Sequence, residues 1–193
     1  METTVLAASP ETLESLRALL LQEGGLLASL VQDGAPGEPR NGSAASEEGA
    51  ESPARTAARG PRTERRGEQY ELLVETIYEG YLLHYGAPRV VRASDADLRV
   101  LAGDRLYALG LARLVELGDT PAVAELADTI TLSALAQGTG DVRLADAVWA
   151  AGARAVGWGP SEQHARAKEL VANGADEAFE AMRTSAAGPS STP

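Results

Sequence analysis

Few side chains in this sequence could do chemistry, and most of them are carboxylates. The chain has no cysteine, which excludes disulfides, thiolate nucleophiles and zinc sites of the cysteine type. Its two histidines, His84 and His164, are far apart in the sequence, and no serine stands beside a histidine or in a nucleophile-elbow motif. Acyl transfer therefore has no support, and any bound metal would be a hard cation such as Mg²⁺ on oxygen ligands.

Three glutamates recur every fourth residue in the segment 69–85. Glu71, Glu75 and Glu79 share one face of the helix expected there, while the apolar residues of the segment fall on another. Such a ladder could bind a cation. A stripe that faces solvent is the better interpretation.

Asp104 interrupts the apolar stretch LAGDRLYALGLARL at 101–114. On a helical wheel the arginines and Glu116 of this helix form one polar arc, and Asp104 lies opposite that arc among leucines. A buried carboxylate without a partner is costly. We therefore expect Asp104 to make a buried hydrogen bond near the start of a central helix, or else to face a polar cavity.

The elements that position these residues are expected to be helices. Hydrophobic residues make up 44% of the chain but aromatic ones only 4%, so alanine, leucine and valine must build the core, which favours packed helices. No segment alternates with period two, as a strand would. The predicted fold is an all-α antiparallel bundle of about five to six helices. These are expected at residues 10–31, 69–85, 94–117, 120–138, 142–157 and 162–183.

Capping residues mark several helix ends. Ser9 can cap the first helix, which Gly24-Gly25 should weaken or break. Ser94, with Asp97 three residues later, is expected to cap the helix that contains Asp104. Asp141 can cap the helix that follows it.

Residues 32–68 contain no aliphatic side chain larger than alanine and no aromatic, so they are predicted to form a disordered linker. The linker carries a basic tract that could dock on an acidic partner, although a solvated tether is the better interpretation. The tract consists of Arg55, Arg59, Arg62, Arg65 and Arg66. The predicted division is an N-terminal helical segment (1–31), the linker, a helical domain (69–183) and a disordered tail (184–193).

The overall charge limits the partners. The formal net charge of −11 argues against nucleic-acid binding, which needs a positive field. No run of about 18 apolar residues predicts a membrane span. The N-terminus lacks the pattern of a signal peptide, so a cytoplasmic location is expected.

Several segments resemble trans-polyprenyl diphosphate synthases. VLAGDRLYALGLARLVELGD at 100–119 is similar to a family helix of the type LLAGDYLLARALELLAELG. The segments VETIYEGYLLHYG (74–86) and ELADTITLSALAQG (125–138) resemble the helices before and after it. The resemblance covers roughly residues 70–140 and implies a helical scaffold of the isoprenoid synthase type.

The metal-binding motifs of that family are missing. Its first aspartate-rich motif, DDxxD, would follow Leu83-His84, but Tyr85-Gly86 stands there, and no second DDxxD occurs after Asp104. Without two carboxylate clusters to hold Mg²⁺, ionisation of a diphosphate has no support. The resemblance therefore implies a packing role for Asp104 and no catalytic or metal site.

The tyrosines gather in the two helices that carry the resemblance. They could line an apolar cavity for an isoprenoid tail, but ordinary core or dimer packing is the better interpretation. Trp158 and His164 could also line a pocket. The residues expected to line the cavity between these two helices, or to be buried polar groups, are Asp104, Tyr81, Tyr85, Tyr107 and His84.

The leading functional prediction is a non-catalytic helical subunit in isoprenoid metabolism without a cofactor. Its partner would be a second copy or a catalytic prenyl synthase. One alternative is a degenerate prenyltransferase, or an enzyme that binds an isoprenoid diphosphate with Mg²⁺. It would use Glu71, Glu75, Glu79 and Asp104. The other alternative is an adaptor that docks through its linker.

Overall fold

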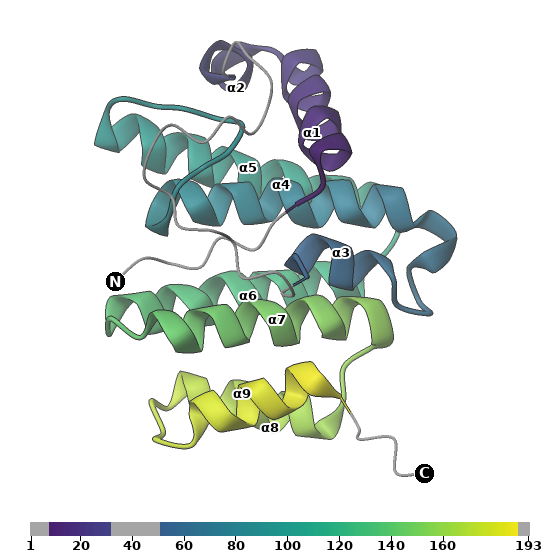
Figure 1. Ribbon diagram of the computed structural model, residues 1–193, viewed down its shortest axis with the longest axis vertical. Coiled ribbons are helices and arrows are strands. Elements are labelled where there is room, and N and C mark those ends of the chain that lie inside the picture. The colour runs from purple at the N-terminus through teal and green to yellow at the C-terminus, as the bar shows by residue number, and fades with distance from the viewer. Residues whose placement is uncertain (1–7, 32–50, 189–193) are drawn as a thin grey trace. The chain divides into compact units, whose positions relative to one another are not determined.

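The computed structural model describes residues 8–31 and 51–188. The prediction of an all-α fold is confirmed: the described residues form helices and one isolated β-bridge, between Val31 and Val91, but no strand. No helix in this part of the chain combines the length and apolar character needed to cross a membrane. The helices are α1 (Pro10–Glu23), α2 (Gly25–Leu30), α3 (Pro53–Ala58), the 3₁₀-helix η1 (Glu64–Arg66), α4 (Gly67–Tyr85), α5 (Ala96–Glu116), α6 (Thr120–Gly138), α7 (Val142–Trp158), α8 (Glu162–Ala172) and α9 (Ala178–Ala187) (Figure 1).

The described part of the chain has more helices than expected because glycines interrupt two of the predicted ones and because α3 and η1 form within the range predicted as a linker. Gly24, with φ of +70°, separates α1 from α2, as its position suggested. Gly174, with φ of +64°, separates α8 from α9, so the single helix predicted over 162–183 is wrong. The predicted disordered tail is wrong for residues 184–187, which belong to α9, and residues 189–193 lie outside the described residues.

Most of the predicted caps are confirmed. The hydroxyl of Ser9 accepts the N–H of Thr12 at 3.1 Å, and the carboxylate of Asp141 accepts that of Leu144 at 2.9 Å. The cap of α5 is an exception, because Asp95 and not Ser94 accepts the N–H of Leu98, at 3.0 Å. Both side chains suit the role, and the helix begins one residue later than expected.

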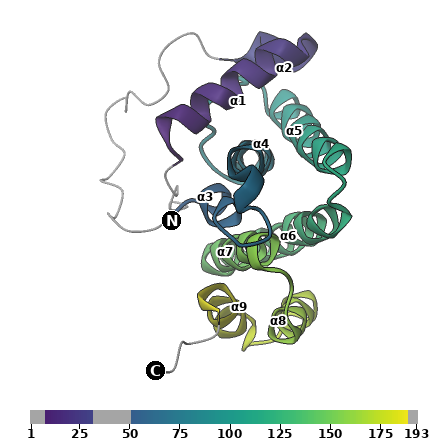
Figure 2. The ribbon, with the colours of Figure 1, turned by 90° about the vertical axis from the view of Figure 1, so that its right-hand side faces the viewer.

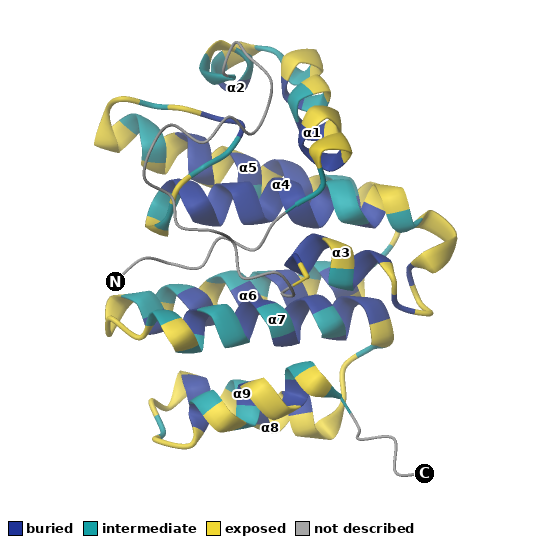
Figure 3. Cartoon of the chain, in the orientation of Figure 1, coloured by how far each residue is buried: buried dark blue, intermediate teal, exposed yellow. Residues whose placement is uncertain are grey.

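The described residues form two compact units. The first lies within residues 1–55 and 68–113, and the second within 56–67 and 114–193. In the first unit, leucines of α1 and α2 share a core with α4 and α5. Much of α4 is buried, including its central turns (Figure 3).

Glycines bring α4 and α5 close together. A Cβ atom on Gly80 would lie 2.9 Å from the carbonyl oxygen of Gly103, and one on Gly110 would overlap the side chain of Ile77. Both contacts are tighter than ordinary packing allows. The glycines of LAGDRLYALG are therefore what permits this helix pair.

The second unit is built around α7. Helix α6 packs along α7, and α9 packs along both α7 and α8 (Figure 2). The apolar core of these helices includes Leu132, Val148 and Met182. Five of its seven buried members are alanine or valine, so small aliphatic side chains supply much of the packing.

Residues 51–68 are ordered, so the predicted linker is wrong over this range, while residues 32–50 lie outside the described residues. Within the second unit, the N–H of Arg62 donates to the carbonyl of Gly157 at 3.0 Å, and the buried hydroxyl of Thr63 donates to that of Ala57 at 2.5 Å. A Cβ on Gly60 would overlap the backbone of Gly157. This turn packs backbone against backbone, which needs small residues and not large aliphatic ones.

Gly60→Ala should therefore destabilise the second unit by at least about 2 kcal/mol, because the added methyl group has no room and its neighbour is backbone. Urea unfolding followed by tryptophan fluorescence measures this unit, since both tryptophans lie in α7. Gly138→Ala is the matched control: a Cβ there meets no atom within 4 Å, so we expect no loss. Equal stability of the two variants would contradict the tight contact.

Candidate functional site

The prediction that the glutamates of α4 form a stripe facing solvent is wrong. Glu75 and Glu79 are both fully buried, and Glu71 is half-buried. The carboxylate of Glu71 accepts a hydrogen bond from the hydroxyl of Thr12 at 2.6 Å, which ties α4 to the start of α1. Glu71 therefore has a partner within the fold, and so do Glu75 and Glu79, whose partners lie in the connection between α4 and α5.

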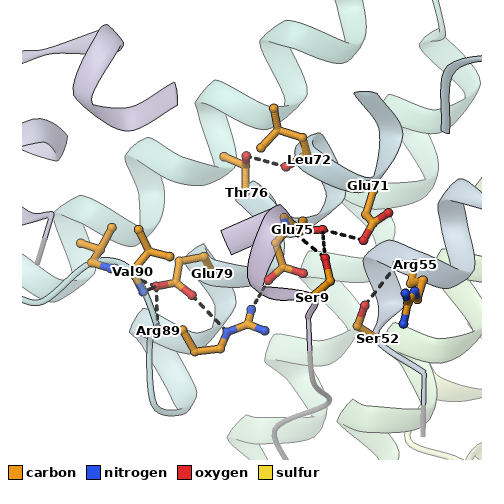
Figure 4. A network of polar contacts seen from close by, with 12 residues as sticks. Ser9, Ser52, Arg55, Glu71, Leu72, Glu75, Thr76, Glu79, Arg89 and Val90 are labelled. Carbon is orange, nitrogen blue, oxygen red and sulfur yellow. Dashed lines mark hydrogen bonds and ion pairs between the residues drawn. The ribbon is translucent and has the colours of Figure 1, made fainter. Parts of the chain in front are cut away.

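Arg89, in the connection between α4 and α5, is the counter-ion of the two buried glutamates. Its Nη2 atom donates to Oε1 of Glu75, and its Nε lies 3.5 Å from Oε2 of Glu79 (Figure 4). The guanidinium also lies over the ring of Tyr78, 5.4 Å from the centroid. The sequence interpretation missed Arg89. The available signal was an arginine just beyond the end of a helix with three glutamates.

Glu79 also fixes the backbone of this connection. Its Oε1 atom accepts three consecutive N–H groups, from Arg89 at 2.7 Å, Val90 at 2.6 Å and Val91 at 3.0 Å. The next residue, Arg92, donates its N–H to the carbonyl of Leu30 at 2.9 Å. One carboxylate thus holds the connection that pairs with the end of α2.

The cluster is electrostatically unbalanced, because two carboxylates share one guanidinium. Burial raises the pKa of Glu75 to about 7, Arg89 acts against this rise, and the charges of Glu79 and Glu71 add to it. The Oε2 atoms of Glu75 and Glu79 have no hydrogen-bond partner. No three histidine or acidic side chains among the described residues form a metal-binding group, and the contacts present make this cluster structural.

The five residues predicted to line a pocket or to be buried do come together, around His84. The ring of His84 stacks on Tyr107 at 5.3 Å between centroids and lies 5.7 Å from Tyr85, which contacts Tyr81 at 5.4 Å. The Nε2 atom of His84 lies 3.2 Å from a carboxylate oxygen of Asp104. Gly103 makes room for this, because a Cβ there would lie 2.5 Å from the same Nε2.

Asp104 is not buried, however, and the predicted buried hydrogen bond is wrong. Its side chain is 64% exposed. The arginines of α5 explain the error: Arg99 donates to the carbonyl of Leu83 at 2.9 Å, and Arg113 pairs with Glu23. The polar arc is thus partly packed against neighbours, and part of the apolar arc that contains Asp104 faces solvent instead.

The tyrosines form a packed wall on α4 and α5. Tyr81 is fully buried, Tyr107 is partly buried with its pKa raised by that burial, and Tyr85 is exposed. A shallow hollow of about 230 Å³ in the same unit lies elsewhere, between α5 and the junction of α1 and α2. Its lining consists of residues 23–27, Leu101 and Arg105. None of the predicted pocket residues lines this hollow.

The second unit contains a buried polar chain that the sequence did not suggest. The Nδ1 atom of His164 lies 2.8 Å from the hydroxyl of Ser185, and its Nε2 lies 2.7 Å from Oε1 of Glu125. The Nζ of Lys168 donates to Glu125 at 3.0 Å and to Asp128 at 2.7 Å. The expectation that no serine has a histidine beside it is therefore wrong in three dimensions, because Ser185 and His164 are 21 residues apart.

These hydrogen-bonded side chains join three helices, α6, α8 and α9. Burial acts to raise the pKa of Glu125, but hydrogen bonds and charge from His164 and Lys168 outweigh it and lower that pKa. Serine, histidine and carboxylate are in the order of a nucleophilic relay. Ser185 is buried on the inner side of α9, however, and the contacts present tie the helices together.

The remaining candidate residues divide between structural and exposed positions. In the basic tract, Arg62 donates to the carbonyl of Val156 at 2.6 Å and pairs with Asp119 at 3.1 Å, so it supports the second unit. The other arginines of the tract, Arg55, Arg59, Arg65 and Arg66, are exposed. Of these, Arg59 and Arg66 also have interaction partners. Trp158, also proposed for a pocket, is 40% exposed under the guanidinium of Arg154.

Glu75→Gln should change the pH dependence of stability. A raised carboxyl pKa means that the folded state binds the proton more tightly, so wild-type stability is lost as pH rises from about 4.5 to about 7. The variant cannot lose this proton. Between pH 4.5 and 7.5 the free energy of unfolding of the variant should therefore rise by up to about 3 kcal/mol relative to that of wild type. Urea unfolding followed by circular dichroism measures this difference. Glu14→Gln, at an exposed site in α1, should show no such gain; parallel curves for Glu75→Gln would refute the buried pair.

The buried chain of the second unit predicts graded losses of stability. His164→Ala leaves the carboxylate of Glu125 without its buried partner and should cost about 3 kcal/mol, whereas Ser185→Ala removes one hydrogen bond and should cost about 1 kcal/mol. Tryptophan fluorescence in urea measures both. The exposed neighbour Thr184, changed to alanine, should stay within about 0.5 kcal/mol of wild type. A His164 variant as stable as the Thr184 variant would contradict the tie.

Comparison with known proteins leaves the family of this chain open. No protein-family model, curated protein sequence or solved structure matches it. The resemblance to polyprenyl diphosphate synthases therefore stays a prediction from the sequence.

Proposed function

We propose that this chain is a non-catalytic helical subunit that acts by association, with a second copy of itself or with a catalytic prenyl synthase in the cytoplasm. One observation carries the proposal: the carboxylates that could have held Mg²⁺ are occupied within the fold. Glu75 and Glu79 bind Arg89 and the connection that follows α4, and Glu71 binds Thr12. Asp104 stands apart from them beside His84.

An enzyme of the degenerate prenyltransferase type would need these groups free. Ionisation of a diphosphate requires several Mg²⁺ ions held by clustered carboxylates. Glu75 and Glu79 are fully buried, and withdrawing them from Arg89 would break the ion pairs that offset the cost of burying their charges. The structure of the first unit therefore favours association over prenyl transfer.

Exposed apolar side chains on α5 support the same proposal. Val100 is 49% exposed and Leu101 is 56% exposed, and both lie in the second turn of α5. A pair of exposed aliphatic residues at adjacent positions is a feature of association surfaces when it belongs to a larger patch. This surface is available for a partner.

Two measurements test the proposal. The purified chain, incubated with isopentenyl and allylic diphosphates and Mg²⁺, should show no prenyl transfer, and turnover that depends on Glu75 or Glu79 would overturn it. Co-expression with a catalytic prenyl synthase from the same genome should yield a complex of fixed stoichiometry, unless the chain associates with itself. A chain that is monomeric alone and stays unbound by the synthase would contradict association in both forms.

A further inference from the structure

The outer side of α5 in the first unit is more apolar than a solvated helix face. We define the α5 face as Val100, Leu101, Asp104, Arg105, Ala108 and Ala112, all of which are exposed. Leu101, Ala108 and Ala112 follow one another at spacings of seven and four residues, which places them in a single row along the helix. The side chains of the two alanines are small and project little from the helix, so a second helix can approach closely.

The charges on the α5 face lie on its two flanks. Successive residues of an α-helix are about 100° apart, so Asp104 and Arg105 fall on opposite sides of the row. Asp104 has its carboxylate largely in solvent despite its contact with His84. Arg105 is exposed, and no hydrogen bond or ion pair to it is found among the described residues. One flank is therefore acidic and the other basic.

We propose that the α5 face binds a second copy of this chain through a two-fold axis parallel to α5. Such an axis places the acidic flank of one copy against the basic flank of the other. Asp104 of each copy then pairs with Arg105 of its partner, twice in the dimer, while Leu101, Ala108 and Ala112 meet their counterparts. The proposal rests on the proposed function, since it names the surface and the partner by which the chain associates.

The arrangement of charges selects this geometry over the alternative. In an antiparallel pair, like flanks would face each other, and Asp104 would approach acidic residues of the same flank, including Asp97. The chain as a whole carries a net charge of −11, so unspecific self-association is opposed by repulsion. A partner surface must therefore supply a cation at this position, and the exposed Arg105 of a second copy does so.

A charge-swap cycle tests the pairing, with sedimentation equilibrium on the full chain as the measurement. The wild type should be a dimer at concentrations of about 10 to 100 μM. Asp104→Arg and Arg105→Asp each place like charges together at both contacts, so each should weaken the dimer at least about tenfold. The double variant Asp104→Arg/Arg105→Asp restores opposite charges, and its dissociation constant should return to within about threefold of wild type.

Controls separate this surface from general effects of charge and folding. Leu101→Asp should abolish the dimer. Glu180→Arg/Arg183→Glu, which reverses an exposed ion pair on α9, should leave it unchanged. Circular dichroism and thermal unfolding of every variant should match wild type, which shows that a monomeric variant is folded.

The outcomes also distinguish this inference from the proposed function. A monomeric wild type overturns the α5 dimer, whereas a complex with the catalytic synthase would then leave the proposed function standing. A dimer that neither single charge change weakens, or that the double variant does not restore, overturns the α5 face while self-association stands. Weakening by single changes with rescue by the double change supports the pairing directly.

Discussion

Burial of two glutamates on one helix is the constraint on which the first unit depends. Glu75 and Glu79 have no exposed surface, so each must find its partners inside the protein or accept a large desolvation cost. Arg89 and the three N–H groups that follow α4 supply these partners. The path of the connection between α4 and α5 is therefore set by electrostatics. Its pairing with the end of α2 follows from that path.

Close approach of α4 and α5 is the second constraint, and it explains what α5 presents to solvent. Gly80 and Gly103 let the helix backbones meet, and Gly103 also admits the ring of His84. The inner side of α5 is used in this contact, and Arg99 caps the end of α4 through the carbonyl of Leu83. The opposite side, with Leu101 and Ala108, remains exposed. A helix with apolar residues on both sides has one side left for association.

The second unit also contains buried polar side chains that are paired with one another, although the residues differ from those of the first unit. Its helices have small aliphatic cores, and the buried chain from Ser185 through His164 to Glu125 adds directional contacts between three helices. Directional bonds specify one arrangement, which interchangeable alanines do not. Both units therefore use buried polar groups for structure.

The sequence by itself determined the features that depend on neighbours along the chain. The all-α class, most helix ranges, the caps at Ser9 and Asp141 and the break at Gly24 follow from periodicity and from contacts three or four residues away. The gathering of tyrosines around His84 was also foreseeable, because they lie on two consecutive helices.

Only the tertiary structure decided which polar residues are buried. Periodicity gives the faces of a helix but not which face meets a neighbour, so Glu75 was expected in solvent and Asp104 in the interior, and both are the reverse. The order of residues 51–68 depends on Gly60 meeting Gly157, nearly one hundred residues away, and the pair of His164 with Ser185 depends on the turn at Gly174. These contacts join segments remote in the sequence, and local propensity carries no information about them.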